Sequence, residues 1–250
     1  GESNNLAYTV NLTRNNTRIN PIFPTGGSTF SINAKFTPPY SLFSGKDYSN
    51  LESLEEFQDE NGNPLTEIID QERFRWLEFY KIKFNGTWYA PVYEKLTLKT
   101  QVDFGFIGAY NLSRGNIPFE RFFLGGDGMV SYALDGRETI ALRGYPNQSL
   151  SSRDGSNIYN KFSLELRYPI TLKPSASIYA LTFLEAGNGY NSFREFNPFS
   201  SKRSAGAGVR IFMPAFGLLG IDFAYGFDNV NSNLTTPNGW ETHFVIGQRF

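Results

Sequence analysis

The stretch Lys161-Phe162-Ser163-Leu164-Glu165-Leu166-Arg167-Tyr168 alternates between polar and apolar residues without a break. Successive side chains of a β-strand point to opposite faces of its sheet, so this pattern predicts a strand with one charged and one apolar face. Pro169 follows directly and indicates a turn. The charged face of this strand must meet water, and its apolar face must be kept from water.

The same period recurs along the chain. In residues 29–36, Phe30 and Ile32 share a face that is opposite to Ser31 and Asn33. We count about nine such segments, with residues 177–187 the least clear because both of their faces are rather apolar. The others lie near residues 6–13, 79–90, 96–110, 204–211 and 219–227, and in a last strand that ends at Phe250.

Composition excludes several classes of protein. The formal net charge of −1 provides no basic stripe, so we predict no nucleic-acid partner. No run of 18 apolar residues exists that could form a transmembrane helix. The chain is rich in aromatic residues and glycine, with 24 Phe, 14 Tyr and 24 Gly. Aromatic girdles and small lumen residues of a membrane barrel would use this composition, and so would a soluble β-sandwich.

The lengths of the connections favour the barrel over the sandwich. Long segments at 40–71, 111–157 and 188–202 alternate with short turns, as they do where external loops alternate with periplasmic turns. The polar faces also carry full charges, which would form the solvent face of a sandwich or the wet lumen of a barrel. The predicted strands, of roughly 9–13 residues, are long enough to cross a bilayer when tilted. We therefore predict an all-β, transmembrane antiparallel β-barrel.

The insert at 40–71 and the odd number of strands do not follow from the alternating pattern. The acidic insert at 40–71 places Leu51, Leu54 and Phe57 at helical spacing, which fits a short surface helix or a solvated loop equally well. An odd strand count is unusual, because bacterial single-chain barrels have an even number of strands. We therefore expect the N-terminal part of a larger barrel to be missing, and residues 1–250 to be its C-terminal portion.

Several stretches in order resemble the outer-membrane assembly-factor superfamily, the BamA family in particular. They are Phe119 to Gly126, Leu142-Arg143-Gly144-Tyr145, Phe162 to Pro169, Phe183 to Gly187, Pro214 to Tyr225 and Ile246 to Phe250. The resemblance covers nearly the whole chain and implies the last nine of 16 barrel strands. The first strands and the periplasmic POTRA repeats would be absent. One departure is about fifteen extra residues between Gly126 and Leu142, which leaves the path of that loop open.

The resemblance also implies roles for particular residues. The long loop would enter the lumen and place Arg143 at its tip, with Gly144 allowing a tight backbone and Tyr145 packing on the wall. Glu165 and Glu185 are the lumen-facing carboxylates at the matching positions, and charge-assisted bonds to an Arg fork between them would be strong. Without the family, a solvent-exposed loop arginine is the alternative, worth under about 1 kcal/mol in a surface pair.

The resemblance implies a second element in the last strand, a seam that would open sideways into the bilayer. Gly247 weakens strand pairing where it lies, so it is a candidate kink point, or else a lumen-facing glycine without a role. An unpaired edge is a template on which an incoming barrel protein could add its own strand. Phe250 resembles the aromatic ending of outer-membrane proteins, so this chain would itself be a substrate of the same machine.

The resemblance therefore implies the central barrel of the machinery that folds proteins into the bacterial outer membrane, as a multi-pass protein. The implied partners are unfolded outer-membrane proteins, periplasmic or lipoprotein accessory subunits and outer-membrane lipid. The alternatives are a two-partner-type transporter of the same superfamily and a passive porin. We predict no enzymatic activity, catalytic residue, metal or cofactor, because the single histidine, His243, has no nucleophile elbow or metal-spaced partner.

Overall fold

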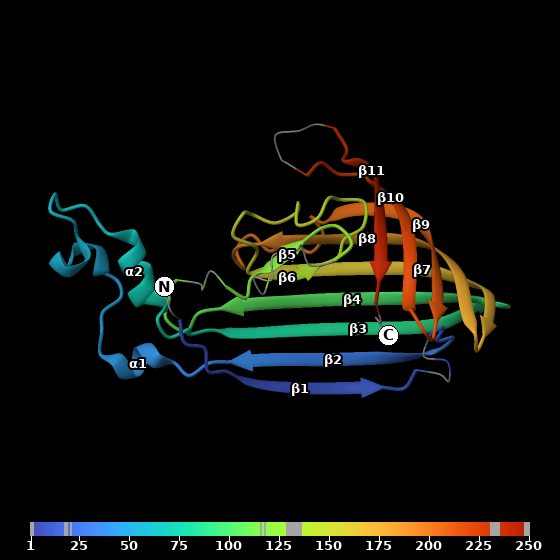
Figure 1. The fold of residues 1–250 in the computed structure, drawn as a ribbon, viewed down its shortest axis with the longest axis horizontal. Helices are drawn as coiled ribbons and strands as arrows, with labels where there is room; N and C mark the ends of the chain where they lie inside the picture. The colour runs from blue at the N-terminus through green and yellow to red at the C-terminus, as the bar shows by residue number, and fades with distance from the viewer. Residues whose placement is uncertain are drawn as a thin grey trace.

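The computed structural model describes residues 3–17, 20, 22–115, 117, 119–128, 137–230 and 236–247. Its main feature is one antiparallel sheet of nine strands in the order β1-β2-β3-β4-β7-β8-β9-β10-β11 (Figure 1). The all-β, antiparallel prediction is thereby confirmed. The strands are β1 (Tyr8–Asn15), β2 (Gly27–Phe36), β3 (Tyr80–Tyr93), β4 (Leu96–Gly108), β7 (Ile158–Lys173), β8 (Ala176–Tyr190), β9 (Lys202–Met213), β10 (Gly217–Gly226) and β11 (Gly239–Ile246).

The sheet curves into part of a barrel with two different faces. On β7, Leu164 and Leu166 of the convex face are exposed, whereas Glu165 and Arg167 of the concave face are buried. Exposed apolar side chains and buried charges are the reverse of a soluble protein, and they fit a lipid-facing wall around a polar lumen. Within the described residues the sheet is open, because β1 pairs only with β2 and β11 only with β10.

Short and long connections lie at opposite ends of the strands. The pairs β3–β4 and β7–β8 are joined by tight turns at 94–95 and 174–175, whereas β4 and β7 are joined through residues 109–157. The connection between β1 and β2, residues 16–26, is longer than these turns. Within its described residues, Phe23 packs edge-on to Tyr179 on the lumen side, with ring centroids 5.3 Å apart. Burial of an aromatic side chain explains why this connection is not a plain hairpin.

The acidic insert forms short helical turns around Leu51, Leu54 and Phe57, where the spacing fitted a short surface helix or a solvated loop equally well. Residues 51–53 and 55–57 form two 3₁₀ turns, η1 (Leu51–Ser53) and η2 (Glu55–Phe57), separated by an extended Leu54. Spacing by three suits a 3₁₀ turn as well as an α-helix, so the pattern alone could not separate them. Two α-helices, α1 (Tyr40–Ser44) and α2 (Thr66–Phe74), flank these turns.

The helices among the described residues are short, and the longest of them is α2. No helix in the described part of the chain is long and apolar enough to cross a membrane. The insert has its own small core, in which Tyr48, Leu51, Phe57 and Ile69 are buried together.

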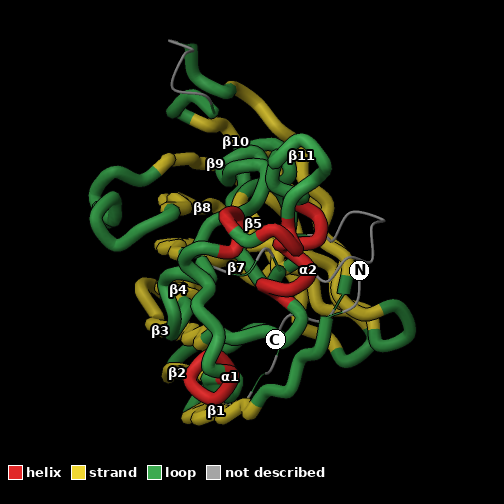
Figure 2. The backbone as a smooth tube through the Cα atoms, turned by 90° about the vertical axis from the view of Figure 1, so that its left-hand side faces the viewer, coloured by secondary structure: helices red, strands yellow, loops and turns green. Residues whose placement is uncertain are grey.

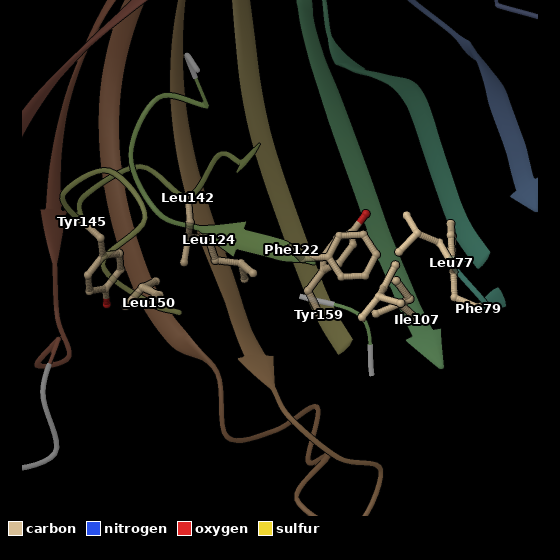
Figure 3. Close-up of a cluster of buried hydrophobic side chains, with 10 residues drawn as sticks. Leu77, Phe79, Ile107, Phe122, Leu124, Leu142, Tyr145, Leu150 and Tyr159 are labelled. Atoms are coloured by element: carbon tan, nitrogen blue, oxygen red, sulfur yellow. The ribbon is translucent and has the colours of Figure 1, made fainter. Parts of the chain in front are cut away.

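The long connection between β4 and β7 lies against the concave face of the sheet. It contains two short parallel strands, β5 (Phe122–Leu124) and β6 (Glu138–Ile140). Its apolar residues form the largest core of the molecule together with lumen-facing side chains of the wall (Figure 3). For example, the Phe122 ring meets the Tyr159 ring of β7 at 4.6 Å, edge to face. This inward-folded loop, predicted from the sequence, positions the site described next.

Candidate functional site

The tip of the inward-folded loop places Arg143 among three carboxylates of the wall. Its Nη2 lies 2.8 Å from Glu165 Oε1 and 2.7 Å from Glu185 Oε1, and its Nη1 lies 3.2 Å from Asp222 Oδ2. The Arg143 backbone N–H also donates to Glu185 Oε2 at 2.8 Å. The guanidinium stacks 3.5 Å from the centroid of the Phe183 ring. These side chains are all buried, so the contacts act away from bulk water.

The carboxylates come together because they share one face of the sheet. Glu165 lies on β7, Glu185 on β8 and Asp222 on β10, each at a lumen-facing position of its strand. Each also has a second cation: Arg167 bonds Glu165 at 2.6 Å, Lys161 lies 3.2 Å from Glu185, and Arg210 forms a two-pronged pair with Asp222. The buried charges are thus neutralised locally, which their desolvation requires.

Gly144 approaches the wall more closely than any side chain would allow. Its φ is +87°, and a Cβ at this position would lie 2.8 Å from the Ser204 Cβ and 3.1 Å from the Gly226 nitrogen. Its N–H donates to His243 Nε2 at 2.8 Å, and its carbonyl accepts from the Asn238 side-chain amide at 2.9 Å. His243 accepts this bond only with Nε2 unprotonated. Gly144 therefore links the loop tip directly to β11 and to the loop before it.

Tyr145 is fully buried behind the loop tip. Its hydroxyl donates to the carbonyl of Arg203 at 2.6 Å and accepts from the Asp228 N–H at 3.3 Å. Burial raises the pKa of the Tyr145 phenol to about 12, so the hydroxyl remains a donor at neutral pH. The tripeptide thus contacts five successive strands or their ends, from β7 to β11.

Three residues at this site were not assigned to it from the sequence. Asp222 was given no role, His243 was considered only as a possible catalytic or metal-binding residue, and Phe183 appeared only within a stretch that resembles the family. The one available signal was the glycine-rich lumen face of β9 and β10. There a Cβ on Gly208 would lie 1.8 Å from Asp222 Oδ1, so the glycine makes room for the carboxylate.

A second ion-pair cluster holds the loop farther along the wall. Lys81 of β3 lies 2.6 Å from Glu138 and 3.3 Å from Glu120, and its Nζ also donates to the Glu120 carbonyl at 2.7 Å. Lys83 adds a 2.8 Å pair with Glu138, and Lys35 of β2 pairs with Glu120. Burial by itself would raise the pKa values of both glutamates, but the neighbouring ammonium groups lower them below the ordinary value. The loop is thereby attached to both halves of the sheet.

A third pair attaches the acidic insert to the same loop. Arg114 and Glu78 are both buried and lie 2.7 Å apart. Arg114 also donates to the carbonyl of Trp76 at 2.6 Å, and Glu78 accepts from the N–H of Ser41 at 2.7 Å. The insert is therefore held by charge-assisted bonds at the loop end of the barrel.

Gly126 and Leu142, which flank the extra residues, lie side by side. Gly125 N–H donates to the Ile140 carbonyl and Gly126 N–H to the Leu142 carbonyl, each at 3.1 Å. The stretches Phe119 to Gly126 and Leu142 to Tyr145 are thus adjacent in space. Residues 129–136 lie outside the described residues.

Gly247, one of the two predicted seam residues, lies at the free edge of the described sheet. Gly247 follows β11 directly, has φ of +120°, and still donates its N–H to the Leu218 carbonyl at 3.0 Å. That φ belongs to the region that favours glycine, so the backbone bends there. Phe250 lies outside the described residues.

A polar cavity of about 400 Å³ lies beside Arg143 on the lumen side. Charged side chains of both signs line it, including Lys99, Arg167 and Glu185. Among the described residues no group of three or more histidine or acidic side chains is placed to hold a metal ion. The arrangement is chemically suited to fixing a loop and to binding polar groups.

Comparisons with known proteins bear on the fold and the family. The sequence profile of the Omp85 superfamily domain matches residues 1–250. Among curated proteins, no sequence match is found. The fold is similar to the crystal structure of BamA from Haemophilus ducreyi lacking POTRA domains 1-3, with a TM-score of 0.60 and 19% sequence identity. The alignment covers 96% of this chain and 41% of that one, so this chain spans about two-fifths of the solved structure.

Proposed function

Because the chain belongs to the Omp85 superfamily, we propose that it forms part of the barrel of a machine that folds and inserts β-barrel proteins into the bacterial outer membrane. The observation that carries this proposal is the loop tip, where Arg143 bridges carboxylates of β7, β8 and β10. A loop bound this firmly inside the lumen leaves the free strand edge as the part of the sheet open to a new protein. Further strands would complete the barrel, and periplasmic repeats would precede them.

The loop tip supports a role in holding the last strands in position. Gly144 bonds to His243 of β11, and Arg143 bonds to Asp222 of β10, which pairs directly with His243 in the strand ladder. Several charge-assisted bonds in a low-dielectric site hold a geometry well. The edge of β11 would then stay straight and available up to Gly247, where the backbone bends.

The unpaired edge of β11 supports the insertion step itself. A free row of backbone N–H and C=O groups is a template for another strand, and an unfolded outer-membrane protein could pair with it by β-augmentation. Opening of a seam beside β11 would let that strand pass into the bilayer. Gly247 and Phe250 would mark the end of the strand where pairing is weakest. Accessory subunits on the periplasmic side would deliver the unfolded chain.

The alternative within the superfamily is a transporter that exports a partner protein through the lumen. A loop that the Arg143 cluster holds inside the lumen favours this alternative over a passive porin, whose lumen is an open, water-filled channel. Export would require the loop to leave the lumen and break the Arg143 cluster. Insertion requires the opposite, a loop that stays bound while the edge of β11 is used.

Site-specific photo-crosslinking in cells separates the two functions. A photo-reactive residue replaces Phe244, which is exposed on the edge strand, and a matched control replaces Leu166, which is exposed on β7 between two paired strands. Insertion predicts that unfolded outer-membrane proteins crosslink at position 244 and not at 166. Equal capture at both positions would contradict insertion at the edge. Capture of a soluble partner at the lumen-facing Gln101 instead would establish export.

A further inference from the structure

The connection between β8 and β9 folds toward the outside of the sheet, whereas the β4–β7 loop folds inward. In Figure 2 it projects on the side of the sheet away from β5. Phe196 packs edge-on against Phe104 of β4 at 5.6 Å, and Phe193 packs against Phe106 at 5.5 Å. Both partners lie on the convex face of β4. Residues 191–201 therefore cross the outside of β7 to reach β4.

Hydrogen bonds hold residues 191–201 in this position. The Asn160 amide of β7 donates to Ser201 Oγ at 3.2 Å, and the Asn188 amide of β8 donates to the Ser200 carbonyl at 2.9 Å. Ile158 on the same convex face is only 1% exposed, because the connection covers it. The connection therefore covers the convex face of β4, β7 and β8 at their loop end. Its remaining apolar side chains face outward, with Phe199 95% exposed.

An apolar groove of about 690 Å³ lies on the convex face, next to the region that this connection covers. Ala186 of β8 is paired with Phe162 of β7 on one side and with Arg203 of β9 on the other. Because alanine has a small side chain, a groove remains between these two larger residues. Its volume is in the range of sites that bind small molecules. Its walls are side chains of β4, β7 and β8: Thr100, Val102, Phe162, Leu164, Leu184 and Ala186.

The guanidinium group of Arg203 lies at the edge of the groove. The Arg203 side chain is 67% exposed and lies near the loop end of β9, on the convex face. Asp228 accepts from its Nε at 3.2 Å and from its Nη2 at 2.9 Å, which holds the guanidinium in one orientation. Within the described residues, Nη1 donates no hydrogen bond. An apolar slot beneath an oriented guanidinium matches an acyl chain beneath an anionic headgroup.

We propose that this groove binds a single outer-leaflet lipid, with an acyl chain along Ala186 and a headgroup phosphate at Arg203. The proposal rests on the placement of the barrel in the outer membrane, with the long loops outside. The convex face is then covered by lipid tails, so the occupant of an apolar groove there is a lipid. The exposed aromatic rings of residues 191–201 would lie at the membrane–water boundary, where aromatic side chains gather.

Native mass spectrometry of the full-length protein in detergent tests the proposal without any substrate protein. The probe is diphosphorylated lipid A, and the comparison lipid is an uncharged diacylglycerol. Arg203→Gln removes the headgroup contact, and Ala186→Phe fills the groove from the lipid side. The controls are Arg153→Gln, an exposed arginine of the β4–β7 loop, and Ala180→Phe, lower on the convex face of β8.

We expect lipid A to be retained by the unaltered protein and both controls. Arg203→Gln should weaken retention at least tenfold, and Ala186→Phe should abolish it. Equal retention in all five proteins would overturn the proposal, as would equal retention of the uncharged lipid by the unaltered protein. Crosslinking at position 244 is scored separately, so the lipid site and the insertion function can fail independently.

Discussion

Replacing Arg143 by methionine should release the loop tip from the wall while preserving most of its apolar bulk. The guanidinium is 8% exposed and contacts three carboxylates, and loss of one partner from a buried ion pair costs about 3–5 kcal/mol. Lys161, Arg167 and Arg210 remain to neutralise Glu185, Glu165 and Asp222. We therefore expect a loss near the lower end, about 3 kcal/mol in the free energy of unfolding.

A double-mutant cycle with Glu185→Gln isolates the central pair. Equilibrium urea unfolding of the full-length protein in lipid vesicles should give a coupling energy of about 1.5–3 kcal/mol between the two positions. Hydrogen exchange should show faster exchange in residues 137–150 of the Arg143 variant. The control, Arg153→Met, alters an exposed arginine of the same loop and should change neither quantity. A coupling energy under about 0.5 kcal/mol with unchanged exchange would refute the anchor.

Three further predictions concern the contacts around the tip. Gly144→Ala should displace the loop and lower the free energy of unfolding by about 1–3 kcal/mol, because the residue needs a positive φ and the added Cβ would meet Ser204. Thermal unfolding measures this loss, and an unchanged melting temperature would contradict it. His243→Ala should speed exchange of the Gly144 amide, whereas His243→Gln, which retains an acceptor, should restore much of its protection. Folding lowers the pKa values of Glu120 and Glu138, so the stabilisation that they contribute is present above about pH 4.3 and is lost as pH falls through their folded values. Loop protection measured against pH should therefore fall in acid, and Glu138→Gln should flatten that fall; an equally steep fall in this variant would contradict the assignment.

The site shows which contacts a sequence pattern can and cannot predict. The alternation in residues 161–168 places Glu165 on the lumen face, because side-chain direction in a strand follows from parity alone. Parity also places Asp222 on that face, but it does not say which loop residue comes near. The ion pair between Lys81 and Glu138 could not be predicted either, because 57 positions of chain separate the two residues and no local pattern connects them.

Other differences arose where two structures satisfy the same spacing. Leu51, Leu54 and Phe57 fit an α-helix or consecutive 3₁₀ turns, and the core formed with Tyr48 and Ile69 of the insert selected the turns. In the connection between β1 and β2, Phe23 is buried against Tyr179, a contact that no local pattern indicates. In both cases packing against residues distant in sequence decided the conformation.

By itself the sequence determined the strands, their two faces and the alternation of short and long connections, because each depends on residues that are neighbours in the chain. It also pointed to Arg143 as the loop tip through its resemblance to a family. Only the tertiary structure decided that Asp222 and His243 meet that tip, that Lys81 holds the loop a second time, and that residues 191–201 fold outward above a groove. These contacts depend on the curvature of the sheet, which brings strands far apart in sequence around one lumen and one lipid-facing wall.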